Sequence, residues 1–364
     1  MHISELDTPS VLLDLDIMER NMKRMAEYSA SAGVALRPHI KTHKIPELAR
    51  MQVALGAVGI TAAKPGEAVV MSAGGLTDIF VAYPIISAKK ADTLLALSAT
   101  TRLCVSIDSF EAAECLARSS AAHNYDLSIL VEIDVGFGRC GVQSAQAAVD
   151  LALQIERLQG AHFGGLMFYP GHMMVPLEKQ NELLPVVNGV VESAYDALIK
   201  AGLRIDVVSG GSTPMARRSR EFSHLTEIRP GMYPLNDRNL VCGGFATLED
   251  CAVTVLTTVV STAVPYRVIL DGGSKTFSSD RLLTGNNLGH GVLPDDPDAL
   301  FFGLSEEHGH LDISKSSRPY HLGERLRIVP NHVCTTINMH DTIYGIRNDR
   351  VETVWDVAAR GHVQ

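Results

Sequence analysis

The chain has 364 residues, of which 46% are hydrophobic, so it can form one large α/β domain or one domain with a smaller partner. Its formal net charge of −9 argues against nucleic acid as the main partner, because a polyanion binds to a basic surface. The six cysteines show no CxxC pair, and the N-terminus lacks the basic and apolar regions of a signal peptide, so we expect a reduced, cytoplasmic protein.

The first predicted element is the apolar run 9–16, which precedes a helical stretch. Between residues 34 and 233, eight further apolar runs follow one another, and helical stretches separate most of them. The runs lie at 34–39, 57–64, 78–84, 102–108, 127–136, 163–169, 205–212 and 225–233. In the stretches 44–55, 64–75, 109–122 and 144–158, apolar residues recur every three or four positions, as in a helix with one buried face.

Eight buried strands that alternate with helices predict a closed (β/α)₈ barrel, because strands covered on both sides consist of near-continuous apolar residues. We place this barrel at residues 16–235. A doubly wound open sheet is the alternative, but it would normally have fewer units and a glycine-rich loop after its first strand. Here a basic cluster, RPHIKTHK at 37–44, follows the first strand instead.

The pattern changes after Tyr233, where strand-like runs with turns between them replace most helical stretches. These runs lie at 251–275, 324–338, 341–346 and 350–361. They predict a mostly β domain at 236–364. Residues 1–15 could belong to either domain, and we expect them to add a strand to this one. The longest uncharged run, 251–266, is too short to span a membrane and is rich in β-branched residues, so it predicts a strand.

Barrel enzymes carry their chemistry at the C-terminal ends of the strands. In this chain lysine, arginine, tyrosine and histidine dominate those ends, and such a set could bind a phosphorylated, aromatic, electron-withdrawing molecule. The residues at the predicted strand ends are Arg37, His39, Lys41, Lys64, Tyr83, Asp108, Asp134, Arg139, Tyr169, His172, Ser209 to Thr213, Arg229 and Tyr233.

A phosphate site is predicted at the ends of strands seven and eight. The segment SGGST (209–213) has two glycines that let backbone N–H groups approach an anion, and hydroxyl groups flank them. The segment RPGMY (229–233) supplies the other side, where barrels often hold a phosphate. We therefore assign Ser209, Gly210, Gly211, Ser212, Gly231 and Tyr233 to cofactor binding, although a Gly-Gly-Ser segment alone is more often a simple turn.

Lys41 is the candidate for a Schiff base. A lysine at the end of a buried strand, near other cations, is a better nucleophile near neutral pH, because its surroundings disfavour the charged form. A solvated lysine at a helix start is the alternative, and it suits Lys44 better because Lys44 begins the next predicted helix. With a phosphate site nearby, pyridoxal 5'-phosphate is the cofactor that fits.

A second cluster, VPNHVCTTIN at 329–338, contains His332 and Cys334. In a strand, residues two apart point to one face, and neutral imidazole and thiolate are suitable zinc or manganese ligands. A buried cysteine beside a hydrogen-bonded histidine is the commoner arrangement, so the pattern alone leaves both interpretations open.

The motifs RPHIKTHK, VEIDVGFGRCGV, GLMFYPGH, SGGST, RPGMY and PNHVC occur in this order along the chain. Together they resemble the D-threonine aldolase and D-serine dehydratase family of fold-type III pyridoxal phosphate enzymes, over essentially the whole chain. The resemblance implies an alanine-racemase-like barrel followed by a β domain, a homodimer, and a small D-3-hydroxy amino acid as substrate.

The resemblance also implies roles for single residues. It assigns Lys41, not Lys44, to the covalent link with pyridoxal phosphate, places Arg139 near the pyridine nitrogen, and places Tyr169 beside the linkage. It implies a divalent metal (Mn²⁺, Zn²⁺ or Mg²⁺) on His332 and Cys334. We add His39 to the cofactor-binding residues and His172 as a candidate for moving the proton of the β-hydroxyl group.

The leading interpretation is a lyase of the D-threonine aldolase type, which cleaves its substrate to glycine and an aldehyde. The alternative is elimination of the D-serine dehydratase type, to a 2-oxo acid and ammonia. Cys334 supports this alternative, because the dehydratases carry cysteine at the second ligand position whereas the aldolases tend to carry aspartate. An amino-acid racemase is a further alternative. A non-catalytic pyridoxal phosphate carrier is disfavoured, since such proteins usually consist of a barrel alone.

Overall fold

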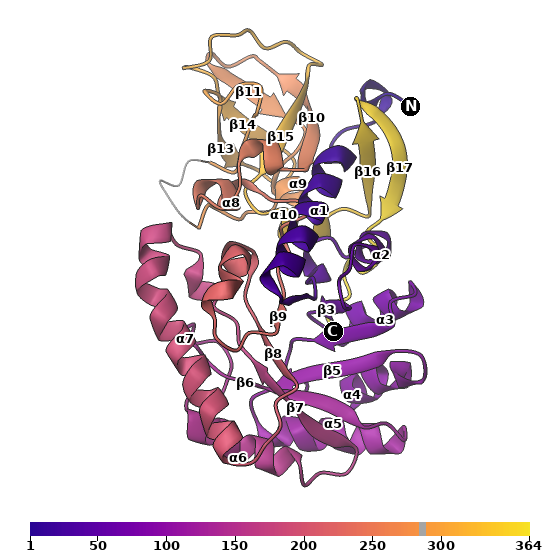
Figure 1. Cartoon of the computed structure of the whole chain (residues 1–364). Coiled ribbons are helices and arrows are strands. Elements are labelled where there is room, and N and C mark those ends of the chain that lie inside the picture. Colours follow the sequence, from indigo (N-terminus) through magenta and orange to yellow (C-terminus); the bar gives the residue numbers. More distant parts are fainter. Residues whose placement is uncertain (284–288) are drawn as a thin grey trace. The chain divides into compact units, whose positions relative to one another are not determined.

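The computed structural model describes residues 1–283 and 289–364, which form two compact units. The barrel unit consists of Met25–Lys41, Ile45–Gly231 and Gly361–Gln364. The β unit consists of Met1–Arg24, Thr42–Lys44 and Met232–Arg360. Figure 1 shows the elements of both units, coloured along the sequence.

The barrel unit contains a parallel sheet in the order β2-β9-β8-β7-β6-β5-β4-β3. Its strands are β2 (Ala35–Leu36), β3 (Ile60–Ala62), β4 (Asp78–Val81), β5 (Arg102–Ile107), β6 (Leu127–Glu132), β7 (Ala161–Met167), β8 (Val207–Gly210) and β9 (Glu227–Ile228). A parallel bridge between His39 and Thr61 joins the two ends of this order. All eight predicted strands are present, and the predicted barrel fold is confirmed.

Helices follow most strands of the barrel, as Figure 1 shows. They are α2 (Pro46–Ala54), α3 (Pro65–Ala73), α4 (Ala88–Leu95), α5 (Phe110–Ala122), α6 (Ala145–Ile155) and α7 (Leu177–Lys200). Proline at the first helical position begins α2 and α3, where its missing N–H costs no helical hydrogen bond. Ser144 caps α6 by accepting a hydrogen bond from the N–H of Ala147. The helix α1 (Leu15–Ala32) begins in the β unit, and its last residues belong to the barrel unit.

The β unit contains a mixed sheet in the order β13-β14-β11-β10-β1-β16-β17, and β15 pairs with β10 and β12. Its strands are β1 (Ser10–Asp14), β10 (Val253–Ser261), β11 (Arg267–Leu270), β12 (Gly291–Val292), β13 (Leu300–Leu304), β14 (Gly309–Asp312), β15 (Arg325–Pro330), β16 (Thr342–Arg347) and β17 (Arg350–Asp356). Strand β1 lies between β10 and β16, and Leu12 packs with Leu256 and Ile346 in the core. The predicted strand at 251–266 corresponds to β10.

The prediction of a continuous strand through His332 and Cys334 is wrong. Strand β15 ends at Pro330, and the short helix α10 (Val333–Asn338) begins three residues later with His332 as its N-cap. Proline has no N–H to donate to a sheet ladder, so it suits the end of a strand. The hydroxyl groups of Thr335 and Thr336 donate back to the carbonyl of His332, which stabilises the helical turn.

Lys44 is not the solvated lysine expected from the sequence. It is buried, its backbone has a φ of 58°, and its Nζ lies 3.5 Å from the carbonyl oxygen of Ala359. The N–H of Ala359 in turn donates to the carbonyl of Lys44, at 3.0 Å. The left-handed turn at Lys44 precedes α2, which begins only at Pro46.

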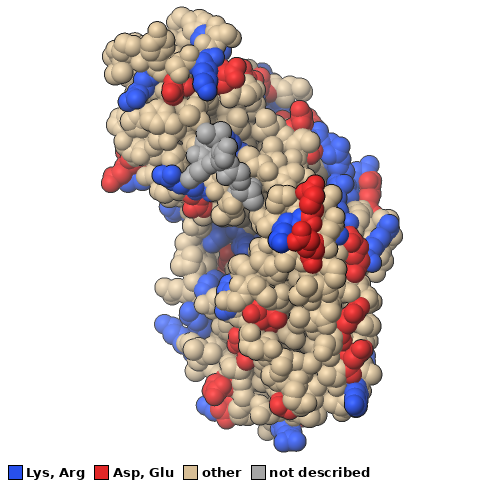
Figure 2. Space-filling view, turned by 90° about the vertical axis from the view of Figure 1, so that its left-hand side faces the viewer, with Lys and Arg blue, Asp and Glu red and all other residues tan. Residues whose placement is uncertain are grey.

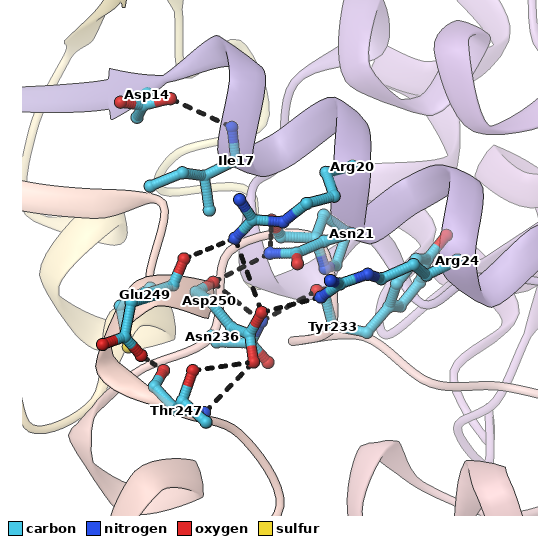
Figure 3. Close-up of polar contacts among 12 residues, drawn as sticks. Asp14, Ile17, Arg20, Asn21, Arg24, Tyr233, Asn236, Thr247, Glu249 and Asp250 are labelled. Carbon is cyan, nitrogen blue, oxygen red and sulfur yellow. Dashed lines mark hydrogen bonds and ion pairs between the residues drawn. The ribbon is translucent and has the colours of Figure 1, made fainter.

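Polar contacts attach the first part of α1 to the segment before β10 (Figure 3). The amide of Asn21 donates to the carbonyls of Pro234 and Asp250, at 3.1 and 2.8 Å. Asn236 also donates to the carbonyl of Asp250, at 3.0 Å, and the guanidinium of Arg24 pairs with the Asp250 carboxylate at 3.0 Å. These contacts hold the chain that leads from Tyr233 to β10 within the β unit.

The surface carries both signs of charge. On the face drawn in Figure 2, basic and acidic side chains are interspersed, and no broad basic surface is visible there. Among the described residues, no helix combines the length and apolar character needed to cross a membrane.

Candidate active site

Lys41 lies in the 3₁₀ turn Ile40–Thr42, directly after the first barrel strand. The turn is fixed because Ile40 is fully buried and because the N–H of His39 donates to the carbonyl of Pro230, at 3.1 Å. The N–H of Lys41 lies 3.4 Å from His39 Nδ1. The ammonium of Lys41 is 5.7 Å from the centroid of the Tyr169 ring. His39 therefore helps to shape the turn that directs Lys41 towards Tyr169.

Tyr169 also contacts Arg139. The guanidinium carbon of Arg139 lies 4.6 Å from the Tyr169 ring centroid and 5.4 Å from that of Phe137, within the range of cation–π attraction. Phe137 packs its ring edge-on to Tyr169, with centroids 5.6 Å apart. The barrel thus brings together the predicted residues Lys41, Arg139 and Tyr169. Among the described residues, no carboxylate forms an ion pair with Arg139.

Asp134 determines the shape of the loop that carries Arg139. Its Oδ1 accepts hydrogen bonds from the N–H groups of Gly136, Phe137 and Gly138, at 3.1, 2.9 and 3.1 Å. Gly136 and Gly138 have φ values of 103° and 71°, which favour glycine. Burial acts to raise the pKa of Asp134, but the hydrogen bonds from this loop outweigh it, and the net effect is a lowered pKa.

His172 lies in the short turn Gly171–Met173, after Tyr169. Its ring stacks on Phe137, with centroids 6.4 Å apart and an angle of 20° between the planes. Its Nδ1 is buried and has no hydrogen-bond partner within 1–283 and 289–364. A buried imidazole nitrogen without a partner is available to a ligand. Phe137 and Tyr169 form a pair of aromatic rings. His172 therefore lies beside this pair, as do Lys41 and Arg139.

A buried polar network connects residues at the ends of β2, β8 and β9. Glu227 accepts hydrogen bonds from Ser209 Oγ and from Arg37 Nε, both at 2.6 Å. Arg229 donates to Ser209 Oγ and, at 2.8 Å, to the carbonyl of Phe168, the residue before Tyr169. Burial lowers the pKa of Arg229 to about 10. The Ser209 hydroxyl is thus engaged within the protein, and Arg37 is paired with carboxylates.

The glycines of the predicted phosphate segment are required by their surroundings. A Cβ at Gly210 would lie 2.2 Å from the Phe168 ring, and Gly211 has a φ of 86°. Ser212 precedes the 3₁₀ helix Thr213–Glu221 and makes no side-chain capping bond. Gly231 ends the main segment of the barrel unit, whereas Tyr233 is a buried residue of the β unit. The packing of the Phe168 ring therefore accounts for the glycine at 210, and the positive φ accounts for the glycine at 211.

His332 and Cys334 have interacting side chains although they are not in a strand. His332 Nδ1 lies 2.6 Å from Asp280 Oδ2, which also accepts from Thr335 at 2.9 Å. Burial acts to lower the pKa of His332, but its interactions with Cys334, together with those with Asp237 and Asp280, outweigh burial and raise that pKa to about 10. Since Asp280 engages Nδ1, Nε2 is the nitrogen left for a ligand.

The Cys334 thiol lies 3.3 Å from Thr42 Oγ1. In the part of the chain that the structure describes, no group of three or more His, Cys, Asp or Glu side chains could hold a metal ion. Histidine and cysteine are suitable donors for a divalent metal, so the pair fits two positions of an open coordination sphere.

Sequence reasoning missed Glu132, Phe137, Glu227 and Asp280. Glu132 ends β6, is buried, and has its pKa raised by burial, which outweighs the attraction of Arg139 and Arg229. An acidic residue at the end of an apolar run was a usable signal for Glu132. Asp280 carried no such signal, since 52 residues separate it from His332.

Two family models match the chain. The model described as "Alanine racemase, N-terminal domain" matches residues 13–235. The model described as "Putative serine dehydratase domain" matches residues 252–346.

Curated proteins match over almost the whole chain. D-threonine aldolase of Arthrobacter sp. is 32% identical, over 99% of this chain and 94% of its own length. 3-hydroxy-D-aspartate aldolase of Paracoccus denitrificans is 33% identical, over 99% of this chain and 94% of its own length. D-threo-3-hydroxyaspartate dehydratase of Delftia sp. is 32% identical, over 96% of this chain and 97% of its own length.

Solved structures are similar over the same extent. D-threonine aldolase from Filomicrobium marinum superposes with a TM-score of 0.93 at 31% identity, covering 99% of this chain and 98% of the other. D-threo-3-hydroxyaspartate dehydratase from Delftia sp. HT23 has a TM-score of 0.90 at 30% identity, covering 98% of both chains. Structures of that dehydratase also include a histidine-to-alanine variant, and a cysteine-to-alanine variant in a metal-free form.

The loop around Arg139 should depend on the charge of Asp134. Because the folded-state pKa of Asp134 is lowered from its usual 3.8, its stabilisation is fully present above about pH 3.8 and is lost as pH falls through the lower folded value. We expect the amides of Gly136, Phe137 and Gly138 to lose protection, measured against the intrinsic exchange rate at the same pH, as the pH falls through the folded-state pKa, and already at neutral pH in Asp134→Ala.

Hydrogen exchange followed by mass spectrometry measures this effect. Asp150→Ala is the matched control, since Asp150 is an exposed carboxylate on α6 that accepts a hydrogen bond from Gln146. Equal exchange in the Asp134 variant and the unmodified protein would contradict the role of this carboxylate.

Proposed function

Because the chain belongs to the D-threonine aldolase and D-serine dehydratase family, we propose that it cleaves D-3-hydroxy amino acids to glycine and an aldehyde with pyridoxal phosphate and a divalent metal. The matched aldolases and dehydratases are pyridoxal phosphate lyases, so the chain is an enzyme of that class. The observation that carries the metal-dependent activity is the hydrogen bond by which Asp280 orients the His332 imidazole, two residues before Cys334 in the chain.

The barrel unit supplies groups that fit pyridoxal phosphate. When bound, this cofactor anchors the amino group of the substrate and withdraws the charge that develops at Cα. We assign its covalent attachment to Lys41 and its phosphate to the backbone of Gly210 to Ser212 and Gly231. We keep Ser209, His39 and Tyr233 as supporting residues of this site. An arginine cannot readily give up its proton, so Arg139 beside the pyridine nitrogen would keep the ring neutral.

The β unit supplies two ligands that fit a divalent ion. We assign Mn²⁺, Zn²⁺ or Mg²⁺ to His332 and Cys334, and water or substrate would complete the coordination. Such an ion supplies Lewis-acid chemistry towards a substrate hydroxyl group. The histidine and cysteine variants of the related dehydratase, one of them metal-free, support this assignment. We propose that His172, whose Nδ1 is buried without a partner among the described residues, accepts the β-hydroxyl proton.

Dehydration is the second candidate function. Cys334 favours it, since the dehydratases of this family carry cysteine at the second ligand position. Cleavage needs removal of the β-hydroxyl proton, whereas dehydration needs removal of the Cα proton and departure of the hydroxyl. A racemase is a weaker candidate and rests on the match of the barrel to the alanine racemase domain.

Product analysis distinguishes these reactions. With pyridoxal phosphate and Mn²⁺, we expect D-threonine to give acetaldehyde and glycine, measured by a coupled alcohol dehydrogenase assay. Pyruvate formed from D-serine would instead favour dehydration, and L-threonine formed from D-threonine would favour a racemase. Absence of turnover with a panel of D-3-hydroxy amino acids would overturn the proposed function.

Lys41→Ala should abolish covalent attachment of the cofactor and reduce turnover at least about a thousandfold, because the nucleophile that forms the link is lost. Borohydride reduction followed by peptide mapping should find the cofactor on Lys41 in the unmodified protein. Two lysines serve as controls: Lys44, whose Nζ faces Ala359, and Lys64, whose Nζ lies 3.5 Å from the Tyr83 ring centroid. Cofactor found on either of them would refute the assignment.

His332→Ala should abolish turnover, while the protein still folds and still binds the cofactor, because a catalytic ion is not needed for folding. Cys334→Asp should retain a metal, with a shift towards manganese, since carboxylate is a harder ligand. Metal content by mass spectrometry, cofactor absorbance and circular dichroism test these outcomes. Unfolding of the His332 variant, or full activity after exhaustive chelation, would contradict a catalytic metal.

A further inference from the structure

Thr42 contacts one of the two proposed metal ligands. It is the last residue of the Ile40–Thr42 turn and directly follows Lys41 in the chain. Thr42 is almost fully buried, and its Oγ1 lies 3.3 Å from Cys334 Sγ, within the β unit. In the part of the chain that the structure describes, the Thr42 hydroxyl group makes no other hydrogen bond.

The Thr42 hydroxyl group does not serve its own turn. A threonine in a helical turn commonly donates to a backbone carbonyl three or four residues earlier. Thr335 and Thr336 do so in α10, where both donate to the carbonyl of His332, at 3.1 and 3.0 Å. Thr42 instead meets a side chain that is 292 residues away in the sequence. Local bonding to the backbone therefore does not account for this contact.

The partner of the Thr42 hydroxyl group is a weak acceptor unless it binds a metal. A buried hydroxyl group needs an acceptor for its proton, and a neutral thiol is a poor one. A cysteine that binds a metal ion does so as a thiolate, whose negative charge accepts a stronger, charge-assisted hydrogen bond. The contact between Thr42 and Cys334 is therefore stronger in the protein with a bound ion. An interaction of this kind increases the affinity for the ion.

The other proposed ligand has a comparable partner. Asp280 Oδ2 lies 2.6 Å from Nδ1 of His332 and also accepts a hydrogen bond from the Thr335 hydroxyl group, at 2.9 Å. Partners of this kind fix the orientation of a metal ligand and increase the affinity of its site. With Asp280 bonded to His332 and Thr42 bonded to Cys334, each proposed ligand has its own oxygen partner.

We propose that Thr42 is a positioning residue of the metal site, whose hydroxyl group donates to the Cys334 sulfur and thereby strengthens binding of the divalent ion. The inference rests on the proposed function, which assigns the ion to His332 and Cys334. Because the hydroxyl group acts on a ligand of the ion, its removal should change metal binding even when no substrate is present.

Zinc binding to the protein loaded with pyridoxal phosphate tests this role. Thr42→Val removes the hydroxyl group but keeps the branched shape, and it should weaken Zn²⁺ binding about tenfold or more, measured by competition with a chromophoric chelator. Thr42→Ser keeps a hydroxyl group and should retain most of the affinity. Thr257→Val is the matched control, because Thr257 is a fully buried threonine of β10 whose hydroxyl group donates to the carbonyl of Leu326, at 3.3 Å. Equal zinc affinity in Thr42→Val, Thr257→Val and the unmodified protein would overturn the inference.

Cobalt substitution separates the hydrogen bond from a general effect on folding. Co²⁺ bound to a thiolate gives a sulfur-to-metal charge-transfer band, and a hydrogen bond to the sulfur raises the energy of this band because it stabilises the sulfur electrons. The band should move to longer wavelength in Thr42→Val and return in Thr42→Ser. If the valine variant does not fold, Thr42→Ala and Thr42→Ser form a second pair that differs by one hydroxyl group. A band at the same wavelength with and without the hydroxyl group would contradict the proposed hydrogen bond.

These measurements distinguish the role of Thr42 from the proposed function. If zinc affinity depends on the Thr42 hydroxyl group but no D-3-hydroxy amino acid is turned over, the proposed function fails and the role of Thr42 stands. If turnover requires the ion but zinc binding is unchanged in Thr42→Val, the role of Thr42 fails and the function stands. A protein that binds no zinc, manganese or cobalt would refute both.

Discussion

The ends of the barrel strands depend on one buried interaction, the contact of Glu227 with Arg37 and Ser209. It joins β9 to the residue after β2 and to β8, and Arg229 extends it to the carbonyl before Tyr169. Removing one partner of a buried pair typically costs about 3–5 kcal/mol, because the other charge is left unpaired. The residues next to the Ile40–Thr42 turn, the glycine segment and Tyr169 are therefore connected by the same buried ionic network, and the loop of Arg139 is stabilised separately by Asp134.

The barrel could be predicted from the sequence because each strand is a short apolar run bounded by polar residues. That pattern arises when a strand is covered on both sides, and it also located Lys41, Tyr169 and Arg139 correctly at the ends of strands or in the loops that follow. The same reasoning failed at α10, where Val333, Thr335, Thr336 and Ile337 have the β-branched composition of a strand. The hydroxyl groups of Thr335 and Thr336 donate to the His332 carbonyl, and the N–H of Val333 at the start of α10 donates to Asp237. These hydrogen bonds outweigh the preference of β-branched residues for a strand.

The missed residues share a physical cause. Glu227 lies within an apolar run and Asp280 within a polar segment, and neither position reveals a partner far away in sequence. Glu227 pairs with Arg37 across 190 residues, and Asp280 with His332 across 52. Composition and periodicity report which face of an element is buried, but they do not report which side chains from distant elements meet. Those contacts determine which polar groups remain available to ligands, as the engaged hydroxyl of Ser209 illustrates.

The chain leaves the barrel unit for only three residues, Thr42 to Lys44, and then returns to it. These residues contact Cys334 and Ala359, so the β unit includes the segment that directly follows Lys41. Neither unit is one continuous stretch of sequence, and no single cut would yield two complete parts. In evolution, the C-terminal part could not be exchanged by recombination at one junction without leaving this short segment among foreign neighbours. We therefore expect the barrel unit and the β unit to be inherited together, and their sequences to diverge together.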